Sequence, residues 1–487
     1  MSLDCNSDPC GSSANATSPC PAVAPGADDI DVRRIAERLA AMGGVDPRVR
    51  AVVPGFDAPF FQAGLAGYSD AAMRIIARRH GCPYCVTEAL LDRTLLAGGR
   101  GFAKADLGEL HENVPGGSED HPLAGQIMGS EPAEMAAAAI KMIEQASRSE
   151  RAYRAMAYAS DGTFAPTQHL RLPGGEQLGR VTLGEDNDGW GSCDPEESSE
   201  DTDFRGSEAK GTFQGADVPE VRGRELRSSS SPELRNFGTS PASFAAIDVN
   251  LACPVKKIER KARGGHWLAE PAGAIRILEA VREAVPAHIA CTVKLRRSFD
   301  DTPEMAANVA RIMDAACGMG YAWSTVHART VAQKYVGPSR WDLLRDLIRE
   351  VRRTRPDAIV FGSGDIWEAA DIFRMVEYTG VQAAAVARGC IGNPWIFRQA
   401  RDLMEGRTPR GPTIAEQAAV LRDHFTLLLA VNRTARRGEA LSSRQIRKFG
   451  IRFAAHHPRG DEVRREMIAV ESREDWEGVV RRFYDEA

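Results

Sequence analysis

Side chains that can donate protons or bind anions follow a series of short apolar runs. Asn250 and Cys253 come after one run, Lys294 ends the next, and His327 ends the one after that. A thiol with an ordinary pKa of ~8.5 is largely protonated at neutral pH, which suits a proton donor better than a nucleophile. These residue types predict a site where Cys253 delivers a proton beside a developing negative charge.

Two glycine-rich groups further along the chain could bind a phosphate. Gly362-Ser363-Gly364-Asp365 and Arg388-Gly389 each follow an apolar run and open onto a helix or turn. Backbone N–H groups in such places bind phosphate well, and parallel barrels often hold a phosphate beside their last two strands. A phosphorylated cofactor is predicted, its ring near Lys294 and His327. The competing interpretation is that Gly364 and Gly389 only form turns.

These groups lie in a repeated alternation of strand and helix patterns. Strands are expected at Phe60–Ala63, Tyr84–Thr87, Leu123–Met128, Ala245–Asn250, Ile289–Lys294, Ser324–His327, Ala358–Gly362 and Ala383–Ala387. Helices are expected between them, at Ala133–Ser147, Pro271–Ala284, Pro303–Gly318, Trp341–Arg353 and Ile366–Tyr378. Eight parallel strands close a (β/α)8 TIM barrel, whose functional residues gather at the C-terminal ends of the strands.

Composition divides the chain into three regions. Residues 1–45 are expected to be a flexible tail with a short helix at Asp31–Met42, and residues 46–408 the barrel. Residues 409–487 are expected to form a small all-α domain with helices at Ile414–Arg433, Ser442–His456 and Asp461–Ala469. An aperiodic, low-complexity stretch at about 149–241 interrupts the barrel. We expect it to be a disordered insertion at the end of the barrel opposite the site.

Charge is segregated along the chain, although the formal net charge is only −5. Nine carboxylates and no Lys or Arg lie between Glu185 and Asp203, whereas ten basic residues and three acids lie between Arg433 and Arg465. A polyanion would therefore bind the C-terminal region. The leader lacks the features of a signal peptide, no run is long enough to span a membrane, and the ten cysteines show no disulfide framework, so a cytoplasmic protein is expected.

Five ordered blocks resemble those of the tRNA-dihydrouridine synthases, and the bacterial branch of that family is the closer match. The blocks are NLACPVKK at 250–257, VKLR at 293–296, VHARTVAQKYVGP at 326–338, GSGDI at 362–366 and ARGCIGNPWIF at 387–397. GLAGYSDAAMR at 64–74 and the block around Glu88 add to them, so the resemblance spans nearly the whole barrel.

The resemblance implies an FMN-dependent oxidoreductase with Cys253 as the catalytic acid. The cofactor-binding residues it implies are Gly64, Leu65, Ala66, Gln126, Lys294, His327, Ser363, Gly364, Asp365, Ala387, Arg388 and Gly389. The chain departs from the family pattern at three of these contacts: Gly64-Leu65 replaces Pro-Met, Ser363 replaces Asn, and Ala387 replaces Gly. NADPH or NADH as the electron donor also comes from the resemblance.

The implied substrate is tRNA, in which the C5=C6 bond of D-loop uridines is reduced. Hydride arriving at C6 leaves an enolate whose C5 must be protonated, and the base must first be extruded into the pocket. We expect Asn250, Arg296 and Arg329 to contact the RNA at the barrel, and Arg444, Arg447, Lys448 and Arg452 to contact it from one helical face. We expect the protein to bind no metal and to be a monomer.

Blander interpretations compete at each point. An FMN barrel that acts on a free pyrimidine or small enone, similar to a dihydroorotate dehydrogenase, would need no basic helical domain. An RNA-binding protein without catalysis would need neither Cys253 nor Lys294. Cys253 could also be a core cysteine, and the basic helix an ordinary solvated face.

Other conspicuous residues favour structural roles. Cys82-x-x-Cys85 lacks a second pair of ligands at zinc spacing, so packing is preferred to a metal site. His456-His457 is interpreted as a helix-terminal or RNA-facing pair. Trp267, Trp341 and Trp395 could stack on a base, but large aromatics between barrel and helix usually belong to the core.

Overall fold

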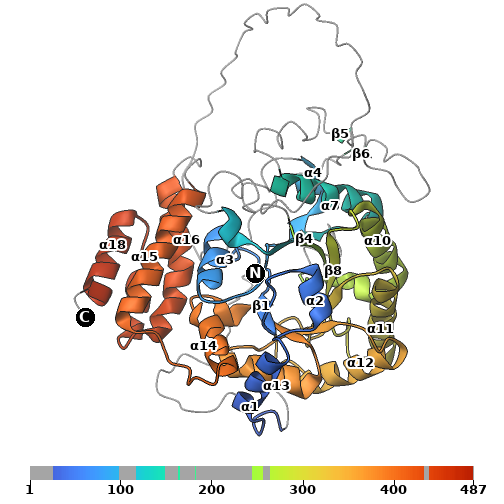
Figure 1. Cartoon of the computed structure of the whole chain (residues 1–487). Helices are drawn as coiled ribbons and strands as arrows, with labels where there is room; N and C mark the ends of the chain where they lie inside the picture. The colour runs from blue at the N-terminus through green and yellow to red at the C-terminus, as the bar shows by residue number, and fades with distance from the viewer. Residues whose placement is uncertain are drawn as a thin grey trace, which may run out of the picture.

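The computed structural model describes residues 26–97, 117–147, 163–164, 181–182, 244–255, 264–432 and 438–485. Eight parallel strands close into a barrel surrounded by helices (Figure 1). In ring order they are β1 (Phe60–Gln62), β2 (Cys85–Val86), β4 (Leu123–Met128), β7 (Ala246–Leu251), β8 (Ala290–Arg296), β9 (Trp323–His327), β10 (Val360–Ser363) and β11 (Ala383–Val386). A further short strand, β3 (Leu90–Leu91), pairs with β4.

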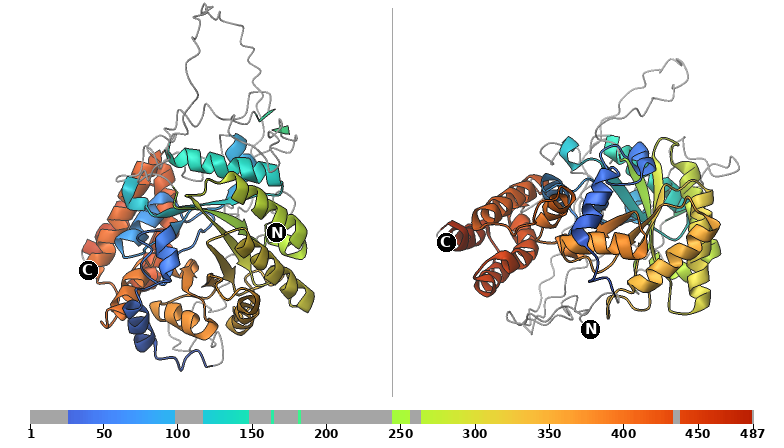
Figure 2. Two further views of the ribbon diagram at one scale, coloured as in Figure 1. Left: turned by 45° about the vertical axis from the view of Figure 1, so that its right-hand side comes forward. Right: turned by 60° about the horizontal axis from the view of Figure 1, so that its bottom comes forward.

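A ring of helices covers the outside of the barrel, as the two views of Figure 2 show. They are α3 (Ala71–Arg79), α4 (Asp92–Ala97), α7 (Pro132–Ser147), α10 (Pro271–Ala284), α11 (Pro303–Gly318), α12 (Trp341–Thr354), α13 (Ala369–Thr379) and α14 (Trp395–Met404). Residues at the N-terminus of a helix fix the position at which it begins. In α11, for example, the Thr302 side chain accepts the N–H of Met305, and Pro303 stands in the first turn.

Side chains alternate between the two faces of each strand, which separates the core from the barrel interior. On β8, Cys291, Val293 and Leu295 point outward into the core that the helices cover. Thr292 and Lys294 point inward and line an interior cavity. The same strand therefore stabilises the fold with one face and carries polar groups on the other.

The N-terminal end of the barrel is closed by an aromatic cluster beneath α2 (Pro47–Val52), which lies across the ring of strands in Figure 1. Phe56 stacks on Tyr84 with ring centroids 4.9 Å apart, and it packs edge-on against Phe361 and Trp323. All four rings are almost fully buried, so this end of the barrel is closed to solvent.

The C-terminal region is helical and lies beside the barrel (Figure 1). It contains α15 (Ile414–Val431), α16 (Gly438–Phe453), α17 (Gly460–Ile468) and α18 (Arg473–Val480), and α15 packs against α3 of the barrel. Tyr68, in the loop before α3, meets Phe449 of α16 edge-on at 5.9 Å. The helical region is thus fixed close to the loop that follows β1.

The structure confirms the (β/α)8 fold and the eight expected strands, with corrected bounds. The fifth strand, expected to end at Lys294, continues to Arg296 in β8, because its ladder extends until Arg296 pairs with His327. The helix expected from Ile366 begins at Ala369, since the Asp371 carboxylate accepts the N–H groups of residues 367 and 368 and forms a cap there.

Other sequence expectations were incomplete or fall outside the described residues. The short helices α2, α3, α4, α14 and α18 were not predicted. The helix expected at Asp31–Met42 is α1 (Val32–Ala41), which packs against α13 and α14. Of the expected insertion, the structure describes only the antiparallel pair β5 (Thr163–Phe164) and β6 (Val181–Thr182). The rest of it and most of the expected tail lie outside the described residues.

Candidate active site at the carboxyl ends of the barrel strands

Lys294 lines the barrel interior close to a chain of polar contacts between the neighbouring strands. Burial lowers its pKa to about 8, and the Asp248 carboxylate opposes that change. Asp248 accepts hydrogen bonds from Gln126 Nε2 at 2.6 Å and Thr292 Oγ1 at 2.6 Å. Three strands therefore present an ordered polar layer directly above the aromatic cluster.

The segment that carries Cys253 is held from both sides. Asn250 Nδ2 donates to Gln126 Oε1 at 2.8 Å, and its Oδ1 accepts the N–H of Ala252 at 2.9 Å. Arg296 Nε donates to the Ala252 carbonyl at 2.9 Å. The Cys253 side chain is half-buried and packs against Leu91 and Met128. Cys253 is thus a fixed, partly accessible thiol at the mouth of the barrel, and not a fully buried core cysteine.

His327, at the end of β9, is surrounded by cations. Its Nδ1 accepts the N–H of Arg329 at 3.1 Å, so the neutral ring carries its proton on Nε2. Burial lowers the pKa of His327 well below its usual value, and so do four nearby cations, Arg296, Lys294, Arg329 and Arg388. At neutral pH the ring is uncharged and offers one N–H donor to the mouth of the barrel.

The loop after β10 is shaped by glycine and anchored by a carboxylate. Gly364 has a φ of +119°, and a Cβ on it would lie 2.4 Å from Ser339 Oγ, so only glycine fits. Asp365 Oδ2 accepts from Arg329 Nη2 at 2.8 Å and from the N–H of Ser339 at 2.7 Å. Ser339 Oγ and Arg329 Nη1 are buried and have no hydrogen-bond partner among the described residues.

The loops after β11 and β1 complete the mouth. Gly389 must be glycine, since a Cβ on it would lie 2.1 Å from the Ile366 carbonyl oxygen. Arg388 is half-buried, with Nη2 3.4 Å from Asp365 Oδ1, and follows Ala387. After β1, a Cβ on Gly64 would lie 2.2 Å from the Thr87 carbonyl oxygen. These close approaches, not only turn formation, explain the glycines.

The loop at Gly64–Gly67 is held by side chains from two directions. The N–H of Leu65 donates to Ser69 Oγ at 2.8 Å, and the N–H of Gly67 donates to Glu88 Oε1 at 2.8 Å. Ala66 lies exposed between them. On β10, Ser363 is buried and its Oγ donates to the Ala385 carbonyl at 3.4 Å, so its side chain points to β11.

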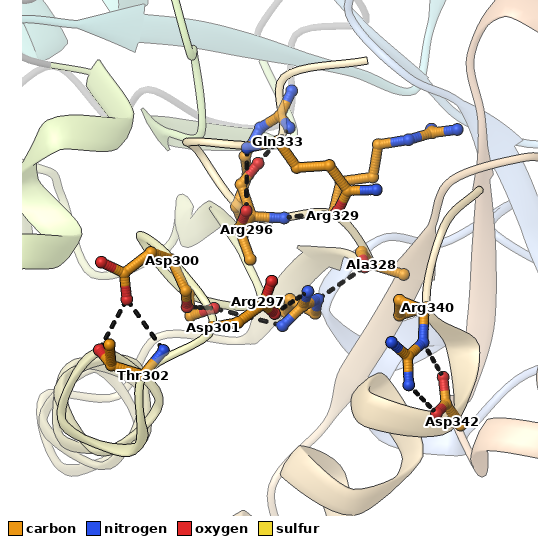
Figure 3. Close-up of polar contacts among 12 residues, drawn as sticks. Arg296, Arg297, Asp300, Asp301, Thr302, Ala328, Arg329, Gln333, Arg340 and Asp342 are labelled. Carbon is orange, nitrogen blue, oxygen red and sulfur yellow. Dashed lines mark hydrogen bonds and ion pairs between the residues drawn. The ribbon is translucent and has the colours of Figure 1, made fainter. Parts of the chain in front are cut away.

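Two arginines expected to contact RNA, Arg296 and Arg329, are buried. Figure 3 draws both side chains among the polar contacts around them. Arg296 Nη1 donates to the carbonyls of Thr330 and Lys334 at 2.8 and 2.7 Å. Arg329 donates to the Gly337 carbonyl as well as to Asp365. Both guanidinium groups hold the β9–α12 loop in place. Their contact with RNA stays a prediction, as does that of Asn250, whose amide is engaged within the protein.

The basic residues of α16 differ in their surroundings. Arg444 and Arg452 are exposed, whereas Arg447 and Lys448 are half-buried. Lys448 Nζ lies 3.4 Å from the Gly67 carbonyl oxygen. Lys448 therefore links α16 to the loop after β1, whereas Arg447 Nη1 donates to the Ile468 carbonyl at the end of α17 at 3.4 Å. Arg433, Arg436 and Arg437 lie outside the described residues.

Other side chains singled out in the sequence have structural roles. Cys82 and Cys85 are buried with their Sγ atoms 3.8 Å apart, and Trp267, Trp341 and Trp395 belong to the core. His456 and His457 end the short helix η4 (Ala454–His456), as the helix-terminal alternative predicted, and His457 is buried with its Nε2 2.8 Å from the Phe483 carbonyl oxygen, which excludes the RNA-facing alternative for it.

Sequence reasoning missed Asp248 and two exposed aromatics, Tyr335 and Trp367, at the mouth. Asp248 could have been found, because an Asp between Ala246 and Asn250 falls on the inward face of its strand. Among the described residues no cluster of three His, Cys, Asp or Glu side chains could hold a metal ion, and no helix there has the length and apolar character to cross a membrane.

The fold and the site define a parallel (β/α)8 barrel whose mouth combines four clustered cations with a positioned thiol. Residues 239–486 match the family described as dihydrouridine synthase (Dus). A "Probable tRNA-dihydrouridine synthase" from Mycobacterium leprae is 34% identical over 239 residues, which cover 48% of this chain and 59% of the relative. "tRNA-dihydrouridine synthase B" from Pseudomonas putida is 32% identical over 246 residues, covering 50% and 68%.

The chain belongs to the dihydrouridine synthase family. It spans 59% of the length of the Mycobacterium leprae relative. Among solved structures, the old yellow enzyme from Trypanosoma cruzi is similar with a TM-score of 0.36 and 12% identity, over 71% of this chain and 88% of that one. This likeness is too remote to bear on activity.

Proposed function

We propose that the protein is a tRNA-dihydrouridine synthase that uses FMN to reduce the C5=C6 bond of D-loop uridines, with NADPH or NADH as the electron donor. The observation that carries the proposal is the cation cluster around His327, next to the loop that presents Cys253. A site with surplus positive charge suits an anionic cofactor, and a thiol beside it suits protonation of the substrate.

The residues at the mouth fit FMN. Gly364 and Gly389 let the loops after β10 and β11 pack tightly against Ser339 and the Ile366 carbonyl, and the backbone N–H groups of these loops could bind a phosphate. Arg388 would supply positive charge there, and the hydrogen-bonding capacity left on Ser339 Oγ and Arg329 Nη1 lies in the same region. Gln126, Lys294 and the Nε2–H of His327 would hold the polar edge of the ring.

Bound FMN would supply hydride to C6 of the uracil. The protein would supply the proton: Cys253 would deliver it to C5 of the resulting enolate, and the thiolate would then be reprotonated from solvent. Asn250 and Arg296 act through the backbone of Ala252, because both bind that residue and so fix the direction of the Cys253 side chain. They are positioning residues for the acid.

The substrate tRNA would bind across the mouth and along α16. Extruding a base costs a few kcal/mol, which contacts to the RNA backbone must offset. The half-buried Lys448 reaches the loop after β1, and Arg444, Arg447 and Arg452 extend the positive surface away from it. RNA held on this face would bring a nearby base to the barrel interior.

The direct test is to purify the full chain, measure its flavin, and incubate it with NADPH and an unmodified tRNA transcript. We expect a yellow protein that releases phosphate-containing flavin on denaturation, and a gain of two daltons at a D-loop uridine by mass spectrometry. A colourless protein, or a yellow one that reduces a free pyrimidine but not tRNA, would refute the proposal.

Charge reversal at Arg447 and Lys448 tests the RNA-binding face. The double variant R447E/K448E should weaken tRNA binding at least about tenfold at low salt, and lower the slope of log affinity against log salt by roughly 0.9 for each phosphate that is no longer neutralised. The control R349E/R353E changes the net charge by the same amount on the exposed side of α12, and it should bind tRNA as the wild type does. Loss of flavin from R447E/K448E would mean that these residues serve the structure instead.

A further inference from the structure

Two exposed aromatic rings that have no role in the site described so far lie beside Arg388 and Arg296 at the barrel mouth. Trp367 follows β10 and is 39% exposed, and Tyr335 in the β9–α12 loop is 50% exposed. The guanidinium of Arg388 lies between them, 4.8 Å from the centre of the Trp367 ring and 5.5 Å from that of Tyr335. Arg296 lies 5.3 Å from the same tyrosine ring.

The loop that presents Tyr335 is braced before any ligand binds. Lys334 adopts a left-handed backbone with φ of 52°, which is unfavourable for a lysine and must be held by its surroundings. The bracing contacts are present: Arg296 binds the Lys334 carbonyl, and Gln333 Nε2 donates to the carbonyls of Val336 and Pro338 at 2.9 Å each. The tyrosine ring is therefore preorganised at the rim.

Exposed aromatics interleaved with cations are the chemistry that binds unpaired nucleobases. Bases stack on aromatic faces regardless of their identity, and neighbouring arginines and lysines attract the phosphates. A protein that extrudes one base leaves the adjacent bases without a stacking partner. Exposed rings at the rim of the pocket can replace that partner. An acidic protein partner would use the cations but gain little from a tryptophan and a tyrosine held apart by Arg388.

We propose that Trp367 and Tyr335, spaced by Arg388, form a stacking platform for the unpaired RNA bases next to the uridine that enters the barrel. The inference rests on the proposed function, because it assumes an RNA substrate. It adds two residues that determine how the RNA backbone is directed at the pocket, on the side of the mouth formed by the β9 and β10 loops.

The test compares tRNA binding by the flavin-loaded full chain and its variants. Trp367→Ala and Tyr335→Ala should each weaken the affinity for an unmodified tRNA transcript about tenfold, whereas Trp367→Phe should keep most of it. The slope of log affinity against log salt should not change, since an aromatic ring carries no charge. Met42→Ala removes an apolar side chain that is 69% exposed just after α1 and serves as the matched control.

Each other outcome overturns the platform. Affinities of both alanine variants equal to that of Met42→Ala would exclude stacking. A slope that falls by about one would mean that Trp367 acts only by holding Arg388 against a phosphate. Loss of flavin from Trp367→Ala would make the ring part of the cofactor site. If the wild-type protein binds no tRNA, the proposed function itself fails, and that result differs from all three.

Discussion

The two ends of the barrel are built from the same strands and are opposite in character. At the N-terminal end, Trp323, Phe361 and Tyr84 pack with Phe56 into a closed aromatic cluster. At the C-terminal end, Lys294 and the neighbouring arginines surround His327. Strand β9 runs from one environment to the other, since Trp323 begins it and His327 ends it.

The N-terminal end of the barrel therefore serves mainly the stability of the fold, and the C-terminal end serves the chemistry. Burying an aromatic side chain stabilises the fold, whereas burying an unpaired cation costs several kcal/mol. The cations of the mouth are therefore tolerated because the closed end supplies the packing, and because loop carbonyls and Asp365 accept hydrogen bonds from Arg296 and Arg329. Substitutions at the two ends should have separable effects.

The largest effect is expected at Cys253. If it is the proton donor, Cys253→Ala should lower the rate of tRNA reduction by about 10²- to 10⁴-fold, the usual contribution of a positioned acid. Flavin content and thermal stability should stay close to wild type, because the side chain is only half-buried. The measurement is single-turnover oxidation of the reduced enzyme by tRNA.

Cys317→Ala is the matched control for this variant. Cys317 is also half-buried, but it lies on α11, outside the barrel. Full activity of the Cys317 variant with loss in the Cys253 variant would locate the acid at the mouth. A Cys253→Ala enzyme that reduces tRNA at the wild-type rate would mean that another group donates the proton.

Damage at the closed end should appear in stability and not in chemistry. Phe361→Ala removes a fully buried ring in contact with Phe56 and Phe61, and should cost about 3–5 kcal/mol in the free energy of unfolding. Urea denaturation measures this cost, and the tRNA reduction rate of the folded fraction should be nearly unchanged. A variant that keeps its stability but loses flavin would show that the two ends are not independent.

Much of the barrel could be predicted because its signal is periodic. Strands such as Leu123–Met128 read as apolar runs, and functional residues follow them in a fixed relation to the sheet. Cys253, Lys294, His327 and Gly364 were found in this way, and the structure brings them to the same end of the barrel. The signal works because parallel strands all end on one face.

The rest depended on contacts that spacing does not encode. The sequence does not show that Arg296, at the end of β8, binds the Ala252 carbonyl, because that bond joins β8 to the segment that follows β7. The exposure of Trp367 was equally invisible, since a tryptophan near a strand end is more often buried. The closed end was missed because α2 has only six residues, too few to show a helical period.

The subtlest expected difference between the ends lies in the pH dependence of cofactor binding. The pKa of Lys294 is lowered to about 8, so its ammonium is charged at neutral pH and loses its proton at mildly alkaline pH. If that charge holds FMN, the affinity for FMN should be constant below about pH 8 and fall above it, by at most about tenfold per pH unit. Flavin fluorescence titrations at a series of pH values measure this.

Asp248, in the polar layer next to Lys294, should shift the pH dependence of FMN binding. The Asp248 carboxylate raises the pKa of Lys294, so Asp248→Asn should lower that pKa further and move the fall in affinity to lower pH. Lys294→Arg should move the fall to higher pH, because a guanidinium stays charged. Phe361→Ala alters only the closed end, so it should not change the pH at which the affinity for FMN begins to fall. Identical pH profiles for all of these proteins would mean that the charge of Lys294 has no part in holding the cofactor.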